Sequence, residues 1–178
     1  MERGAAPLRI ARVIDDRASG DLRASNGTRW RLVSDAVMGG VSRGELTAAA
    51  MNGRACLRLR GRVSLENNGG FLQAALDLSP DGAIDASGYG GIALDVYGPA
   101  ERYNLHLRTD DLVHPWQAYR VSFETSPRWQ TVVLPFHSFQ AHRTAAPFDP
   151  RRLKRVGAVA IGRAFDADLC FSQIGFFG

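Results

Sequence analysis

The feature of this sequence that most constrains its fold is the alternation of apolar and polar residues in short runs bounded by turn residues. In Ile92–Tyr97 (IALDVY) and Tyr103–Arg108 (YNLHLR), every second side chain is large and apolar. A period of two places these side chains on one face of a strand and the polar ones on the other. Glycine, asparagine and proline separate the runs, for example at Gly98-Pro99. The pattern predicts antiparallel sheets with one buried face.

Strands are predicted along most of the chain, and helix signals are few. Asp149 can cap a short helix that starts at Pro150, and a turn of helix is predicted over 136–140. Many short strands with one or two short helices predict an all-β protein, a β-sandwich. The strong strand candidates are Ala55–Arg60, Ile92–Tyr97, Tyr103–Arg108, Gln117–Phe123, Gln130–Leu134, Val156–Ile161 and Leu169–Phe177.

Composition narrows the class of protein. A chain of 178 residues is long enough to bury a core, and we expect a linker-like N-terminal segment over 1–20 and one domain over 21–178. The net charge is +4, but the arginines are scattered along the chain and form no block, which argues against a nucleic-acid-binding groove. No apolar run has the length of a membrane span, and the N-terminus lacks a secretory core. We expect a bacterial cytoplasmic protein that does not insert into a membrane.

Residues suited to catalysis or metal binding show no organising pattern. The histidines at 114, 137 and 142 have no spacing that gathers ligands from one element, and no nucleophile elbow is present. Asp110-Asp111 lies in a polar loop, where solvated turn carboxylates are expected. We therefore predict no enzyme activity, no metal and no cofactor.

The two cysteines, Cys56 and Cys170, each lie in a strand-like run and lack zinc or redox spacing. We expect reduced strand residues. If their two strands pair, the thiols could be neighbours, which leaves a cross-strand disulfide as an alternative.

Two segments carry dense glycine clusters, Trp30–Gly44 and Leu65–Phe71. Glycine permits positive φ and close backbone approach, so the clusters predict tightly shaped loops. One interpretation is purely structural, with Val37 and Met38 in the core or at its rim. The other places Asp35, Ser42 and Arg43 on an exposed loop that contacts a partner. Asn68 can likewise cap its own turn or present its amide to a ligand.

A polar stripe is the more direct candidate for a binding surface. If the middle strands are neighbours, six polar side chains share one outward face: Asp95, Tyr97, Asn104, His106, Arg108 and Arg120. Such a concave sheet face suits a carbohydrate or a peptide segment. The alternative is a solvated face on which Asp95 pairs with Arg108 or Arg120. Nearby, Trp116 is predicted either as an exposed anchor or as a plug at the end of the sandwich.

Several motifs in fixed order resemble one known family. They are Trp30 with Ser34–Ser42 (SDAVMGGVS), Gly61–Phe71 (GRVSLENNGGF), Gly90–Leu94 (GGIAL), Tyr103–Thr109 (YNLHLRT), Trp129-Gln130 and Pro135–Phe139 (PFHSF). Together they resemble the complex I intermediate-associated protein 30 family, over residue 10 to the C-terminus. The resemblance implies a galactose-binding-like jelly-roll sandwich and no established catalytic residue. It also implies an assembly-factor role, as in relatives that hold intermediates of respiratory NADH:ubiquinone oxidoreductase.

From the residues and the resemblance we predict a non-catalytic binding module that chaperones the assembly of a protein complex. Its partner would be a protein intermediate, such as one of a membrane respiratory complex. The alternative is a carbohydrate-binding module that uses the concave sheet face.

Overall fold

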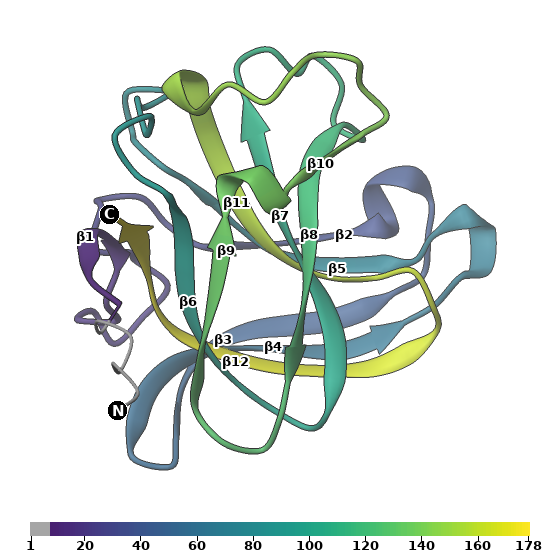
Figure 1. Ribbon diagram of the computed structural model, residues 1–178. Coiled ribbons are helices and arrows are strands. Elements are labelled where there is room, and N and C mark those ends of the chain that lie inside the picture. Colours follow the sequence, from purple (N-terminus) through teal and green to yellow (C-terminus); the bar gives the residue numbers. More distant parts are fainter. Residues whose placement is uncertain (1–7) are drawn as a thin grey trace, which may run out of the picture.

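Two antiparallel sheets stack face to face in the structure, a computed structural model that describes residues 8–178 (Figure 1). The first sheet contains β3 (Arg43–Met51), β4 (Arg54–Val63), β12 (Phe165–Phe177), β6 (Gly91–Tyr97) and β9 (Gln130–Pro135) in that order, with β1 (Ile10–Asp15) also paired to β12. The second sheet contains β10 (Gln140–His142), β8 (Ala118–Thr125), β7 (Glu101–Thr109), β11 (Leu153–Ile161), β5 (Phe71–Asp77) and β2 (Arg31–Ser34). The predicted all-β sandwich is confirmed.

Short 3-10 turns are the only helical elements in residues 8–178: η1 (Asp35–Met38), η2 (Glu66–Asn68), η3 (Phe136–Ser138) and η4 (Pro150–Arg152). At η4, the Asp149 side chain accepts a hydrogen bond from the Arg151 N–H, as its capping role predicted. Within the described part of the chain, no helix is both long and apolar enough to cross a membrane.

The core fills the space between the sheets with the inward side chains of alternating strand positions. Leu57 and Leu59 of β4 face the core from the first sheet, and Leu105 of β7 faces it from the second, all nearly inaccessible to solvent. Trp30 packs its ring against Phe171 with 5.0 Å between centroids. Each such side chain contributes about 1.5–3 kcal/mol to stability through burial. The outward residues of the same strands do not take part in this core.

Strand β1 lies within the segment that we expected to be linker-like. It pairs with β12 near the C-terminus, as Figure 1 shows, so this part of the segment belongs to the first sheet. Asp15, at its end, is fully buried and accepts hydrogen bonds from Trp30 Nε1 at 2.7 Å and from Arg17 Nη1 at 2.8 Å. A buried charge of this kind is tolerated because a buried cation and an indole N–H surround it.

The two cysteines are buried, free and near each other. Strands β4 and β12 pair, with Cys170 opposite Arg58, and Cys56 lies two residues earlier on the same face. The adjacent Cys170 thiol, more than any other group, holds the pKa of Cys56 below its ordinary value. The expectation of reduced strand residues therefore holds, with no disulfide between them.

Candidate functional site

The outward side of the second sheet carries basic side chains on four of its strands and on its edge strand β10. We call this surface the basic face and define it by Arg31, His106, Arg108, Arg120, His142 and Arg155. The register brings these residues together: His106 of β7 is opposite Arg120 of β8, and Arg108 of β7 is opposite Arg155 of β11. Of the predicted stripe, Asn104, His106, Arg108 and Arg120 lie on this surface.

Positive charge exceeds negative charge at the centre of the basic face. Asp77 of β5 is bonded to Arg155 at 2.8 Å and lies 3.6 Å from Arg31. Burial alone would raise the pKa of Asp77, but the hydrogen bond and charge of Arg155, helped by Arg31, lower it. Arg120 has neither a carboxylate nor a hydrogen-bond acceptor within residues 8–178. One carboxylate thus faces four guanidinium groups, and Arg120 is free to bind an anion.

His106 occupies the middle of this surface. Its Nε2 atom is shielded from solvent and has no hydrogen-bond partner in the described part of the chain. Burial, with smaller effects of Arg120 and His142, lowers the pKa of His106 to about 4, so the ring is neutral at pH 7. A buried polar atom without a partner is costly, so His106 leaves one hydrogen bond unmade at the centre of the basic face.

A hydrogen-bonded loop between β7 and β8 lies at one end of the basic face. Arg108 Nη1 donates hydrogen bonds to the carbonyl oxygens of His114 at 2.9 Å and Gln117 at 2.5 Å. The Gln117 Oε1 atom accepts from the Val113 and His114 N–H groups. The loop so held presents Trp116, which is 52% exposed and stacks on the His114 ring at 4.4 Å. Trp116 is therefore exposed and does not plug the sandwich, and Arg108 positions it.

Asp95 and Tyr97 do not share this surface, so that prediction was wrong. Both belong to β6 in the first sheet, where Asp95 accepts from Thr131 Oγ1 at 2.5 Å and pairs with Arg54 at 3.3 Å. Tyr97 packs against Trp129 with 5.4 Å between ring centroids. The turn after β6 carries the chain from one sheet to the other, so the consecutive strands β6 and β7 do not pair. The expected pairing of Asp95 with Arg108 or Arg120 is wrong for the same reason.

Asp35 and Ser42 are buried, so of the two interpretations of this loop the one that exposes them is wrong. Asp35 accepts hydrogen bonds from the Ser42 N–H at 3.0 Å, the Ser42 hydroxyl at 2.5 Å and the N–H groups of Gly70 at 2.6 Å and Phe71 at 3.3 Å. Burial opposes its ionisation, but these bonds outweigh burial and hold the pKa of Asp35 below its ordinary value. Asp35 therefore ties the two glycine-rich loops together.

The outer surface of these loops is partly apolar. Val37 and Met38 are 77% and 57% exposed, so they do not lie in the core or at its rim, and Leu65 of the second glycine-rich segment is also exposed. Arg43 and Asn68 are exposed, and Asn68 has φ 59° within the turn at η2. Contact with a partner remains a proposal for these two residues.

Three members of the basic face were not predicted from the sequence: Arg31, His142 and Arg155. Alternation within each strand assigns these side chains to a face, but their proximity to His106 depends on which strands pair. Strand β7 pairs with β11, which is distant in sequence, and no local pattern reports that.

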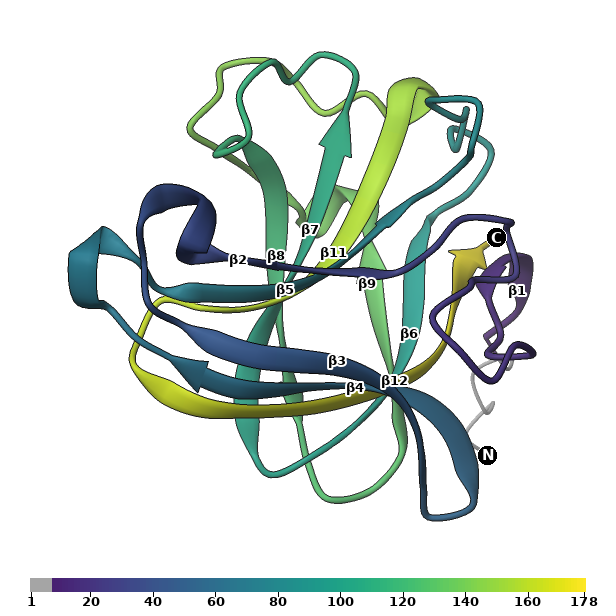
Figure 2. The same ribbon diagram turned by 180° about the vertical axis from the view of Figure 1, so that it is seen from behind.

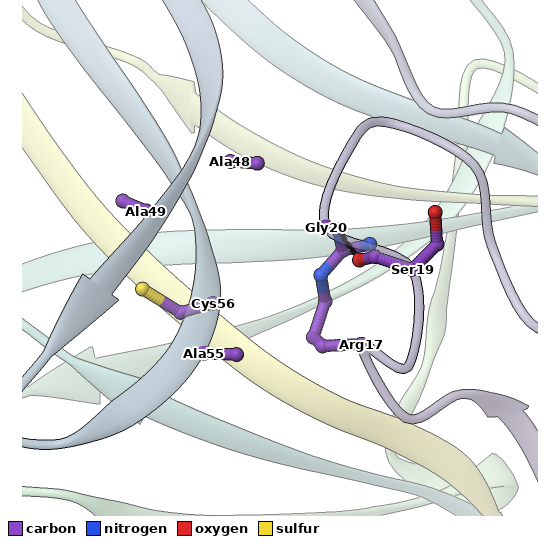
Figure 3. A pocket seen from close by; sticks show the side chains of 7 residues that line it. All are labelled: Arg17, Ser19, Gly20, Ala48, Ala49, Ala55 and Cys56. Atoms are coloured by element: carbon purple, nitrogen blue, oxygen red, sulfur yellow. Dashed lines mark hydrogen bonds between the residues drawn. The ribbon is translucent and has the colours of Figure 1, made fainter.

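Two of the hollows within residues 8–178 lie outside the basic face. One, of about 220 Å³, separates the loop with Arg17, Ser19 and Gly20 from Ala48, Ala49, Ala55 and Cys56 of β3 and β4 (Figure 3). The other, of about 420 Å³, lies on the first sheet and includes Asp95, Thr131 and Val133. Within residues 8–178, no group of three or more histidine, cysteine or acidic side chains is placed to hold a metal ion.

Comparison with solved structures gives the class of fold. The chain aligns with a family 11 carbohydrate-binding module of Clostridium thermocellum in complex with a β-1,3-1,4-mixed-linked tetrasaccharide, with a TM-score of 0.73 and 15% identity over 94% of this chain and 95% of that one. It also aligns with a family 30 carbohydrate-binding module, with a TM-score of 0.63 and 17% identity over 95% and 88% of the two chains. Identities this low carry the fold alone. The protein is a galactose-binding-like jelly-roll sandwich.

Comparison with family models is more specific. The model of the Complex I intermediate-associated protein 30 (CIA30) family matches residues 21–169. The chain belongs to this family, which confirms the resemblance seen in its motifs. No curated protein sequence matches the chain.

Proposed function

We propose that this protein is a non-catalytic binding module that assists the assembly of a protein complex by holding a protein intermediate on its basic face. The family name supports a role with an assembly intermediate, here of a membrane-linked respiratory complex. The proposed place of action is the bacterial cytoplasm. An acidic segment of the partner is the chemistry that the basic face would recognise.

The observation that carries the proposal is the unpartnered pair at the centre of the face. Arg120 has no acceptor in residues 8–178, and the neighbouring His106 Nε2 is buried without a hydrogen bond. A partner carboxylate could accept hydrogen bonds from Arg120. Paired charges that lose solvent on binding contribute to affinity and fix the orientation of the partner. Trp116, exposed and held by Arg108, adds an aromatic anchor at the end of the face.

The test compares charge reversal on the basic face with charge reversal on the opposite sheet. Arg120→Glu removes the free guanidinium, and Arg12→Glu is the matched control because Arg12 is exposed on the first sheet, where it is opposite Phe176 and no carboxylate. Each tagged protein is purified from the native host, and co-purified proteins are quantified by mass spectrometry at low and high salt.

We expect both variants to unfold at the wild-type denaturant concentration. Arg120→Glu should reduce recovery of the specific partner by about tenfold or more, since each 1.4 kcal/mol of binding energy is tenfold. High salt should reduce recovery by the wild type as well. Equal recovery by wild type and Arg120→Glu would remove the basic face from the contact.

Carbohydrate binding is the second candidate, and the exposed stack of Trp116 on His114 favours it. Aromatic rings next to polar groups are common in ligand sites, and a solved neighbour is a module bound to a tetrasaccharide. However, the residues that define the basic face include no phenylalanine, tyrosine or tryptophan. Titration with a mixed-linked glucan, followed by calorimetry, distinguishes the two candidates. Saturable binding that Trp116→Ala abolishes would support carbohydrate binding. The absence of binding heat would argue against it and favour the protein partner.

A further inference from the structure

Within residues 8–178, five strands lie at the edges of the two sheets, and they differ in how they are protected from pairing with another chain. Strand β1 pairs only with β12, and two register shifts interrupt its ladder. Strand β10 has three residues, β2 has four and β9 ends at Pro135, which are devices that limit edge pairing. Strand β3 has nine residues and pairs with β4 without a break from Arg43–Arg62 to Met51–Arg54. Strand β3 ends the strand order of its sheet, and Figure 2 shows β4 next to it and β12 beyond β4. Among these five edge strands, β3 is therefore the one with a long regular ladder and none of these devices.

The hairpin turn determines which backbone groups of β3 face outward. Asn52 and Gly53 connect β3 to β4 and have φ of 48° and 76°, as a type I′ turn requires. The hydrogen bond of such a turn joins Met51 to Arg54, and hydrogen-bonded pairs then alternate along the ladder. The odd-numbered residues of β3 bond to β4, so the N–H and C=O groups of Gly44, Leu46, Ala48 and Ala50 point to the free edge. None of these groups has another backbone partner in residues 8–178.

Side chains along this edge do little to prevent another strand from approaching. Ala48 and Ala50 are exposed, and the run Thr47–Ala50 contains three alanines with no proline or lysine. The two charged residues of the strand, Arg43 and Glu45, lie at its start. Natural edge strands usually carry charges or proline where pairing must be avoided.

The edge is complementary to itself. When two copies of β3 are antiparallel about a two-fold axis at Thr47, Leu46 faces Ala48 and Gly44 faces Ala50, in both directions. Four residues with one donor and one acceptor each provide eight groups per copy, and this register pairs all of them. Its remaining outward pairs bring no like charges together: Arg43 faces Met51 and Glu45 faces Ala49.

We propose that the protein forms a homodimer in which β3 pairs with β3 of a second copy, joining the two first sheets into one continuous sheet. The contact is isologous, as a two-fold interface must be. It goes beyond the proposed binding function and uses the sheet opposite the basic face, so each copy keeps its own basic face free.

The test uses the position that faces its own counterpart. Thr47→Lys and Thr47→Glu each place like charges opposite one another in the dimer, and an equimolar mixture of the two places opposite charges there. Native mass spectrometry at matched concentrations should find a wild-type dimer, monomers of each single variant and a heterodimer in the mixture. A wild type that is monomeric at every concentration tested would overturn the proposal. Pairing of the edge with a strand of a different protein would not rescue it. A dimer that survives both single variants would overturn this register.

A second pair of variants guards against simple unfolding. Ala48→Pro removes an N–H that points to the free edge, where proline is tolerated, and Ala48→Ser retains it. By symmetry the proline removes two hydrogen bonds, so we expect the dimer Kd to rise about tenfold or more, with the serine variant unchanged. Unchanged circular dichroism confirms the fold of both. Arg120→Glu should leave the dimer intact, which separates this test from that of the basic face.

Discussion

Replacing Asp35 with asparagine should lower the stability of the protein strongly, because the carboxylate is buried and holds two loops together. The carboxylate is fully buried and accepts from the Ser42 hydroxyl and from the N–H groups of Ser42, Gly70 and Phe71. Hydrogen bonds to a charged group contribute about 1.5–3 kcal/mol each, and a buried donor left without an acceptor costs about 1–3 kcal/mol. Because the four bonds share one group, their losses are not additive, and we expect a total of about 3–4 kcal/mol.

Urea unfolding followed by tryptophan fluorescence measures this loss. With a slope of about 2 kcal/mol/M, the midpoint of Asp35→Asn should fall by about 1.5–2 M. Asp85→Asn is the matched control, because Asp85 is exposed and its side chain bonds only to Ser87 nearby. That variant should unfold close to the wild-type midpoint. An Asp35→Asn midpoint equal to that of the control would refute the role of Asp35 as the tie between the two loops.

The same substitution has a defined pH dependence. The folded-state pKa of Asp35 is below its ordinary value of 3.8, so the unfolded chain takes up the proton first as the pH falls. The stability that the carboxylate contributes is therefore complete above the ordinary pKa and is lost as the pH falls through the folded pKa. The difference between wild type and Asp35→Asn should be constant near pH 7 and should shrink below about pH 4.

Three further predictions concern other buried groups. Asp15→Asn should lower stability by about 3–5 kcal/mol in the same urea assay, because it leaves the buried Arg17 without a counter-charge; a loss below about 1 kcal/mol would contradict this. His106 has a folded pKa of about 4, below its ordinary 6.5, so wild-type stability should fall as the pH drops from 6.5 to 4; His106→Gln should lack this slope, and parallel profiles would count against it. The thiols of Cys56 and Cys170 are each 1% exposed, so both should react with Ellman's reagent only at the rate of unfolding, and fast reaction in native buffer would show that they are accessible.

Strand positions were predictable from the sequence because alternation is a local property. Every predicted run coincides with a strand, and the Asp149–Pro150 signal gave the start of η4. The side of the sheet to which each side chain points also followed, as Leu105 and His106 of β7 illustrate. Alternation does not determine which strands pair, because any two strands with one buried face show the same pattern. Asp95 and Tyr97 were misplaced for this reason, and Arg155 was missed.

The glycine-rich loops show a second limit of local reading. A short polar stretch such as that around Asp35 and Ser42 looks solvent-exposed, because nothing in the stretch supplies enough partners for a buried carboxylate. Ser42 supplies two of the four hydrogen bonds to Asp35, and the other two come from Gly70 and Phe71 in the other glycine-rich segment. The two motifs are thus one structural unit, and their exposed residues are apolar side chains such as Val37 and Met38.

Hydroxyl-radical footprinting of the protein with its co-purified partner tests the central claim most directly. Trp116 reports on the basic face because it is 52% exposed, and Val133, 44% exposed on the first sheet, is the internal reference. If the basic face holds the partner, oxidation of Trp116 slows in the complex while oxidation of Val133 keeps the rate of the free protein. Protection of Val133 with Trp116 unchanged would place the partner on the other sheet and contradict the account.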